Sequence, residues 1–299
     1  MSDTPETSAP SPEALVARLA ELMELEAIEV DLFRGPRTRE SWVRVFGGQV
    51  IAQALMAAYG TVEERICHSL HCYFIRPGDI TIPIIFEVDR ARDGKSFTTR
   101  RVVAIQNGQQ IFNLAASFQV AEAGIDHQAA MGETAAPETY PDLDELADHY
   151  ANVMPGLAPP RFRRMPLEMR YVDPPIRAEG DAQAMRTRAW FRLTEDMGGD
   201  VRLQQAALAF CSDFGLLRAS LAPHRLDLHT PGLQTASLDH AMWFHRPTDV
   251  SQWHLYDMTS PSASGARGFA IGSLHRQDGT LVASCAQEGL VRQHEAGAP

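Results

Sequence analysis

The segment GGQVIAQALMAAYG, residues 47–60, decides the fold of this 299-residue chain. It is apolar and rich in alanine, and Gly60 closes it, which is typical of a buried helix. Runs typical of β-strands follow at residues 69–75, 80–90, 97–106 and 110–120. Asn107-Gly108 joins the last two runs, and Asn-Gly between strands is a strong hairpin signal. The stretch therefore predicts a buried helix followed by an antiparallel sheet.

The same plan recurs later in the chain. A helix is predicted over residues 201–217, and strands are predicted near 233–244, 253–259, 267–276 and 280–291. Asp278-Gly279 takes the place of the Asn-Gly turn, and the pair at residues 246–247 repeats the Arg-Pro of residues 76–77. This internal duplication predicts an α+β fold of two fused repeats, each with a long antiparallel sheet wrapped around a central helix.

The remaining segments suggest the domain organisation. Two cores are expected for a chain of this length. Residues 12–25 have the leucine spacing of a lead-in helix. We expect a disordered tail at 1–12, an N-terminal domain at 13–121, a linker with one short helix at 122–165, a C-terminal domain at 166–294 and a second tail at 295–299.

The formal net charge of −11 disfavours nucleic-acid binding, so an anionic ligand must meet a local basic patch. No run approaches the roughly 18 apolar residues of a membrane helix, and the N-terminus does not resemble a signal peptide. We therefore expect a cytoplasmic protein without membrane insertion. The four cysteines lie in apolar contexts without zinc-type spacing and are predicted to be reduced core thiols.

One acidic residue in the second helix breaks local rules. When Gln49 is aligned with Gln204, Ala58 falls opposite Asp213. Asp213 shares the core-facing stripe with Phe210, and a negative charge late in a helix costs roughly 0.3–1 kcal/mol. Such a placement is typical of a functional site. The alternative, that Asp213 caps a loop or pairs with an arginine, stays open.

Two further polar residues lie in predicted strands. Gln287 shares the face of Cys285 by the period of two, so it is either a core amide bonded to backbone or a site residue. Ser237 lies where the alternation is poorly defined, and alone it is an unremarkable hydroxyl.

Several motifs identify a resemblance when they are taken in order. They are VFGGQV (45–50), HSLH (68–71), FIRPG (74–78), SD (212–213), SLDH (237–240), MWFHRP (242–247) and QEG (287–289). The ordered set, with matching gaps from about Leu15 to Arg292, closely resembles the type II acyl-CoA thioesterases. Each piece alone is weak, and the set is strong.

The resemblance implies a double hotdog fold and hydrolysis of acyl-CoA to a free fatty acid and coenzyme A. It carries the family's catalytic residues over to Asp213, Ser237 and Gln287, which would activate a water without a covalent intermediate or a cofactor. Ser237 departs from the threonine of the best-known bacterial form, but it keeps the oxygen. The resemblance also implies a homo-oligomer, a dimer or tetramer.

Binding of coenzyme A would need positive charge at the site, because its phosphates meet an acidic protein. Arg76, Arg246, Arg267 and Gly48 are the candidates for substrate binding, with salt bridges at strand ends as the alternative for the arginines. We expect one active site per chain, because Ala58 cannot accept a proton.

The position that matches Gln287 in the first half depends on how the halves are aligned. It is Ala116 when the hairpin turns are aligned and Ser117 when the Arg-Pro pairs are aligned, and Gln119 lies two or three residues further on.

Other patterns are weaker. The glycine, lysine and serine at 94–96 sit between strands and do not form a phosphate loop, and the pairs His68/His71 and His240/His245 lack a third metal ligand. These histidines are predicted to be core or loop residues. Two rival functions remain: an enoyl-CoA hydratase, which needs an Asp and a His at one helix, and a non-catalytic acyl-CoA-binding protein.

Overall fold

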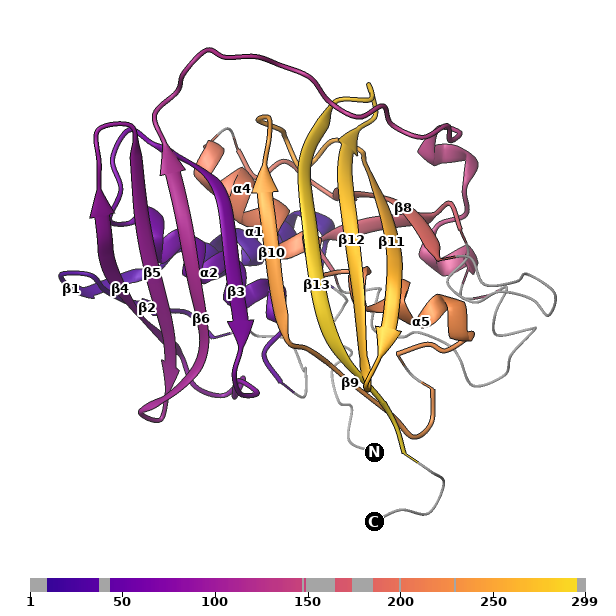
Figure 1. The fold of residues 1–299 in the computed structure, drawn as a ribbon, viewed down its shortest axis with the longest axis horizontal. Coiled ribbons are helices and arrows are strands. Elements are labelled where there is room, and N and C mark those ends of the chain that lie inside the picture. The colour runs from indigo at the N-terminus through magenta and orange to yellow at the C-terminus, as the bar shows by residue number, and fades with distance from the viewer. Residues whose placement is uncertain are drawn as a thin grey trace, which may run out of the picture.

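One antiparallel sheet runs through both halves of the chain (Figure 1). The structure is a computed structural model that describes residues 10–37, 44–146, 148, 165–173, 185–198, 200–228 and 230–294. Within these residues the sheet has 13 strands in the order β1-β2-β4-β5-β6-β3-β10-β13-β12-β11-β8-β7, with β9 beside β13. The pairing of β3 with β10 joins the two halves into one sheet.

The strands of the N-terminal half are β1 (Glu26–Glu29), β2 (Leu32–Gly35), β3 (Ile66–Phe74), β4 (Ile84–Asp93), β5 (Phe97–Gln106) and β6 (Gln109–Gln119). Those of the C-terminal half are β7 (Leu167–Tyr171), β8 (Arg186–Leu193), β9 (Leu233–Ser237), β10 (Asp239–Phe244), β11 (His254–Ser264), β12 (Arg267–Arg276) and β13 (Leu281–Gln293).

The helices α1 (Pro12–Met23), α2 (Gly47–Tyr59) and α4 (Val201–Ser212) lie on one face of the sheet, behind the strands in Figure 1. The short helix α5 (Leu216–Leu221) and the 3-10 turns η1 (Pro137–Thr139) and η3 (Ala222–His224) are further elements, and residues 143–146 of the expected linker are also helical. Almost every residue of α2 and most of α4 are buried, because both helices form the core that the sheet covers. The fold is the predicted one, a long antiparallel sheet wrapped around central helices.

The two central helices pack against each other in opposite directions. The backbone N–H of Gly48, at the start of α2, reaches the side chain of Asp213 at the end of α4. At the other end, the hydroxyl of Tyr59 in α2 donates to Gln205 near the start of α4. Each half therefore brings the end of its own helix to the beginning of the other.

The strand predictions were most accurate beside strong turn signals. The predicted bounds of β5 and β12 coincide with the observed ones. Asn107 and Gly108 have φ of 50° and 70°, the left-handed values that an Asn-Gly hairpin turn requires.

Other boundaries were wrong. The predicted helix 201–217 ends at Ser212, because Gly215 takes φ of 107°, and α5 follows as a separate helix. The predicted strand 233–244 is two strands, β9 and β10, interrupted at Leu238. α1 begins at Pro12, capped by the Ser11 hydroxyl, so the predicted tail does not extend that far. Strands β1, β2, β7 and β8 were not predicted.

The expected linker forms an extended connection after β6. It arches over the C-terminal half in Figure 1, and its Gln128 accepts from the N–H of Leu281 at 3.1 Å and donates to the carbonyl of Gly279 at 2.8 Å. Residues 149–164 of the expected linker and the predicted tails at 1–9 and 295–299 lie outside the described residues.

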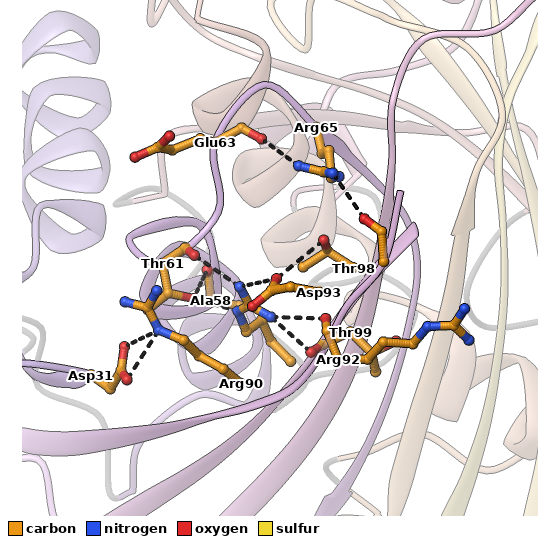
Figure 2. Close-up of polar contacts among 12 residues, drawn as sticks. Asp31, Ala58, Thr61, Glu63, Arg65, Arg90, Arg92, Asp93, Thr98 and Thr99 are labelled. Atoms are coloured by element: carbon orange, nitrogen blue, oxygen red, sulfur yellow. Dashed lines mark hydrogen bonds and ion pairs between the residues drawn. The ribbon is translucent and has the colours of Figure 1, made fainter. Parts of the chain in front are cut away.

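The end of α2 is closed by a polar network (Figure 2). The Thr61 hydroxyl donates to the carbonyl of Ala58 at 2.9 Å and accepts from Nε of Arg100 at 2.8 Å. Arg100 is buried, and its guanidinium also donates to Asp93 at 2.7 Å. The polar groups at the C-terminal end of α2 are therefore paired within the protein.

Among the described residues, no helix is long and apolar enough to cross a membrane.

Candidate active site

Asp213 is the residue that follows α4 and caps its C-terminal end. It has φ of −77° and ψ of −9°, and the next residues leave the helix. The hydroxyl of Tyr256, on β11, donates to the carbonyl of Ser212 at 2.8 Å and fixes this last turn. The helix end thus holds the Asp213 side chain in a defined place, pointing out of α4 and toward the other half.

The partner of Asp213 is the first turn of α2. Its Oδ2 accepts from the backbone N–H of Gly48 at 2.9 Å. α2 has no side-chain cap of its own, because Phe46 occupies its N-cap position. Asp213 therefore supplies the anion that the N-terminus of α2 favours, and this offsets the cost of a negative charge at the end of α4.

Gly48 is required by space at this contact. A Cβ there would lie 2.5 Å from the ring of Phe46 and closer still to the backbone oxygen of Phe210. Only a glycine lets the helix N-terminus approach Asp213 this closely. Gly48 therefore lies beside Asp213 with its N–H on the aspartate, and its role in binding substrate stays a prediction.

Ser237 and Gln287 complete the set. The Ser237 hydroxyl, at the end of β9, donates to Oδ1 of Asp213 at 3.4 Å, and Nε2 of Gln287, on β13, donates to that hydroxyl at 2.8 Å. Gln287 is buried, with 2% of its surface exposed. The structure thus brings together three predicted site residues that come from α4, β9 and β13.

The environment tunes Asp213 for proton transfer. Burial raises the pKa of its carboxyl to about 7, against the hydrogen bonds from Gly48, Gln287 and Ser237 and the positive charge of Arg44, which lower it. A carboxyl with a pKa near neutrality is suited to take and return a proton at the pH where it works.

Two residues at the site were not singled out from the sequence. Arg44 donates from Nη2 to the carbonyl of Thr235 in β9 at 2.9 Å, so it ties the segment before α2 to the strand of Ser237. His240 is fully buried in β10, with Nδ1 2.7 Å from Oε1 of Gln287. The sequence placed it only as a core or loop histidine, and its position on the inward face with Met242 was the available signal.

The three predicted arginines are not brought to one place. Arg76 follows β3 and lies near the start of β10, where the N–H of Phe74 donates to the carbonyl of Leu238. Arg267 is the first residue of β12 and pairs with Leu290 of β13. Arg246 lies beyond the other end of β10, seven residues from Asp239, or roughly 20 Å at about 3.3 Å per strand residue.

All three guanidinium groups already have protein partners. Arg246 forms an ion pair with Asp126, Arg267 bonds Glu288 at 2.8 Å, and Arg76 donates to the carbonyl of Gln110 at 2.7 Å. Arg246 and Arg267 thus form strand-end salt bridges, and a role of any of the three arginines in binding coenzyme A stays a prediction.

Strand register identifies the counterpart of Gln287 in the first half. Leu70 of β3 pairs with Ala116 of β6, and in the second half Ala241 pairs with Ala286, which puts His240 opposite Gln287. Leu70 matches His240 when the Arg-Pro pairs are aligned, so Ala116 matches Gln287. Within the first half, Gln119 pairs with Ile66 and Phe97 instead, at the end of β6.

The same register gives the counterpart of Ser237. Cys67 pairs with Phe118 as Ser237 pairs with Gly289. Together with Ala58, which the helix alignment placed opposite Asp213, the first half therefore carries buried Ala58, Cys67 and Ala116 in the matching positions.

The site offers oxygen and nitrogen groups for a water and no set of metal ligands. Across the described part of the chain, no three His, Cys, Asp or Glu side chains are grouped so as to hold a metal ion. The four cysteines are buried and free. The groups that meet at the site are a carboxyl, a hydroxyl and an amide.

The chain is similar in sequence to known thioesterases. Residues 164–290 match the family described as acyl-CoA thioesterase, and residues 38–119 match the acyl-CoA thioesterase N-terminal domain. The chain is 39% identical to acyl-CoA thioesterase 2 of Haemophilus influenzae over 285 residues, which is 94% of this chain and 99% of that protein. The chain belongs to the acyl-CoA thioesterase family.

Two solved structures superpose on this chain over most of its length. An acyl-CoA thioesterase II of Mycobacterium marinum is 38% identical, covers 93% of this chain and 99% of its own, and superposes with a TM-score of 0.77. A protein with a hot dog fold from Alicyclobacillus acidocaldarius is 20% identical, with 93% and 98% covered and a TM-score of 0.73, which shows the fold alone. The predicted family and double hotdog fold are confirmed.

Proposed function

We propose that this protein hydrolyses acyl-CoA thioesters to a free acid and coenzyme A by direct attack of an activated water. The observation that carries the proposal is the convergence of Asp213, Ser237 and Gln287 at the N-terminus of α2. Membership of the acyl-CoA thioesterase family, in which the relative from Haemophilus influenzae is named an acyl-CoA thioesterase, supports the same substrate class.

In the proposed reaction, Asp213 removes a proton from water while the water oxygen attacks the thioester carbonyl carbon. Ser237 and the amide of Gln287 hold that water, since both lie within hydrogen-bonding reach of Asp213 or of each other. The carbon–sulfur bond then breaks, the electrons leave on the sulfur, and the proton returns to the thiolate. The dipole of α2, whose N-terminus faces the site, favours the negative charge on the intermediate.

The two rival functions make different demands on these residues. A hydratase would need a histidine acting together with Asp213, whereas His240 contacts Gln287 and Ser212. A non-catalytic binding protein would gain nothing from an aspartate whose pKa is raised to about 7.

Release of free thiol from a panel of acyl-CoA esters, detected with a thiol-reactive dye, tests the proposal. Asp213→Asn should remain folded and lose about two to four orders of magnitude in turnover, the scale expected for a general base. Asp257→Asn is the matched control, because Asp257 is a partly buried carboxylate of the same half that pairs with Arg186. Its turnover should stay near that of the wild type.

Three results would count against this function. Absence of thiol release from every ester would refute the activity. Near-normal turnover of Asp213→Asn would remove Asp213 from the mechanism. An equal loss in both aspartate variants would show that the effect is not specific to the site.

The assembly in solution is also a proposal, a homo-oligomer. Large apolar side chains are exposed on the outer face of the sheet where the halves meet, namely Tyr73, Trp243 and Ile271, with 59%, 38% and 45% of their surfaces exposed. A second copy would cover them. Light scattering should then give a mass of at least two chains, and a monomer at micromolar concentration would refute the proposal.

A further inference from the structure

A buried histidine lies behind the proposed site. His240 is on β10, 0% exposed, with Nδ1 2.7 Å from Oε1 of Gln287 and Nε2 2.9 Å from Oγ of Ser212. Gln287 itself reaches Ser237, so one side chain separates the His240 ring from the hydroxyl that bonds Asp213.

The hydrogen bonds of this chain have one consistent direction when Asp213 is ionised. A carboxylate needs donors around it, so the NH₂ group of Gln287 faces Ser237 and Asp213, and its oxygen faces His240. That oxygen can only accept, so Nδ1 of His240 must carry the proton.

The ring can supply only one proton, because burial lowers the pKa of His240 to about 4 and keeps it neutral. Nε2 is then an acceptor, so the single hydroxyl proton of Ser212 goes to it and not to the carbonyl of Ala209, which lies 2.8 Å from the same oxygen. Each residue of the series Ser212, His240, Gln287 and Ser237 thus donates a hydrogen bond to the next, and Ser237 donates to Asp213.

The opposite direction would satisfy the same atoms but turn the amide around. With the proton on Nε2, Nδ1 would accept from the NH₂ group of Gln287, and the amide oxygen would face the carboxylate of Asp213. That arrangement places two acceptors together and leaves no amide N–H for the water. The tautomer of His240 therefore decides whether Gln287 can serve the reaction.

The duplicated half provides an independent observation. By the helix alignment and strand register above, Ser212 matches Ala57 and His240 matches Leu70, both fully buried. The half that lacks the carboxylate, the hydroxyl and the amide thus also lacks the two residues behind them. A histidine needed only for packing would not have to disappear together with the catalytic set.

We infer that His240 is a positioning residue: held by Ser212, its Nδ1–H fixes the amide of Gln287 so that the NH₂ group faces Asp213 and the attacking water. The inference rests on the proposed function, since it concerns the same site.

The test compares two buried histidines. His240→Leu copies the residue that the first half carries, and His254→Leu is the matched control. His254 is also 0% exposed, has a pKa lowered to about 4, and bonds Thr248 and Gln252 outside the site. We expect kcat of His240→Leu to fall about tenfold to a hundredfold, the scale of losing one positioned donor, with KM within about twofold. His254→Leu should keep its kcat. Equal kcat values for wild type and His240→Leu would overturn the inference.

A rescue and a double variant separate positioning from general damage. In His240→Asn the side-chain NH₂ can take the place of Nδ1–H, so kcat should recover to within about tenfold of the wild type. In a Gln287→Ala background, His240→Leu should lower kcat by less than about twofold further, because there is no amide left to position. A full second loss in that background would show that His240 does not act through Gln287.

Nuclear magnetic resonance of the unmodified protein tests the tautomer even where a variant fails to fold. Long-range ¹H–¹⁵N spectra of the histidine rings should show Nδ1 protonated and Nε2 unprotonated for His240 at neutral pH. A proton on Nε2 would refute the proposed direction. The proposed function is tested separately by Asp213→Asn. If His240 carries its proton on Nδ1 but Asp213→Asn keeps its turnover, the proposed mechanism fails while the geometry of His240 holds.

Discussion

The raised pKa of Asp213 makes the stability of this protein depend on pH in a calculable way. The carboxyl titrates near 3.8 in the absence of structure and at about 7 in the fold. Between these values the folded chain holds a proton that the unfolded chain has released, so stability falls as pH rises. The contribution of Asp213 is fully present below pH 3.8, declines toward pH 7 and stays constant above it.

The magnitude follows from the same values. Each pH unit within the window costs about 1.4 kcal/mol, so the interval from pH 5 to pH 7 would cost roughly 3 kcal/mol for a fully enclosed group. Asp213 is partly exposed, and water in the site reduces the effect to about 2 kcal/mol. Asparagine at this position has no proton to lose.

Urea unfolding of the wild type and Asp213→Asn at pH 5, 6, 7 and 8 measures this contribution, because all other titrating groups cancel in the difference. The wild type should lose about 2 kcal/mol relative to the variant between pH 5 and pH 8. Turnover of the wild type should rise about tenfold per pH unit below 7 and level off above it, since only the carboxylate accepts a proton. A free-energy difference that stays constant across this range would refute the raised pKa.

Three further predictions concern the geometry of the site. Gly48→Ala should lower stability by about 1–3 kcal/mol in a denaturant titration and reduce turnover, because its Cβ would displace α2 from Asp213; a variant with wild-type values would contradict the close packing. Charge removal at Arg76 and Arg267 together should raise KM and weaken its salt dependence. Arg246→Gln, beyond the C-terminal end of β10, should leave KM unchanged. The reverse pattern would place the coenzyme A phosphates near Arg246. A non-hydrolysable acyl-CoA analogue should saturate at one equivalent per chain in calorimetry, and two equivalents would show that both halves bind.

The fold could be predicted from sequence because its signals are local. Alternation and the two Gly-containing turns located β5 and β12, and the repeated Arg-Pro pairs revealed the duplication. Strand β8 escaped because it is buried along most of its length and lacks a clear period of two. Strand β7 alternates regularly, but it has only five residues and was missed. The pairing of β3 with β10 has no signal in either strand alone, since it depends on how two distant segments meet.

The site could be predicted only in part for the same reason. Asp213, Ser237 and Gln287 came from a resemblance together with one misplaced charge. The contact of Asp213 with Gly48 spans 165 residues, and nothing in the helix pattern shows that the start of α2 would meet the end of α4. His240 follows a regular strand face with Met242, so it looked like any core residue until its bond to Gln287 was visible.

The fusion of two repeats explains why the site can be asymmetric. Antiparallel helices create two equivalent junctions, and two identical chains would carry the same side chains at both. Here one junction joins Gly48 to Asp213, whereas at the other the Tyr59 hydroxyl donates to Gln205 and accepts from the N–H of Cys67 at 2.8 Å. Tyr59 is 2% exposed, so its side chain fills the second junction. A chain that has sealed one junction can optimise the other for water and proton transfer, and the first half then contributes what the second half cannot provide, the N-terminus of a helix directed at the carboxylate.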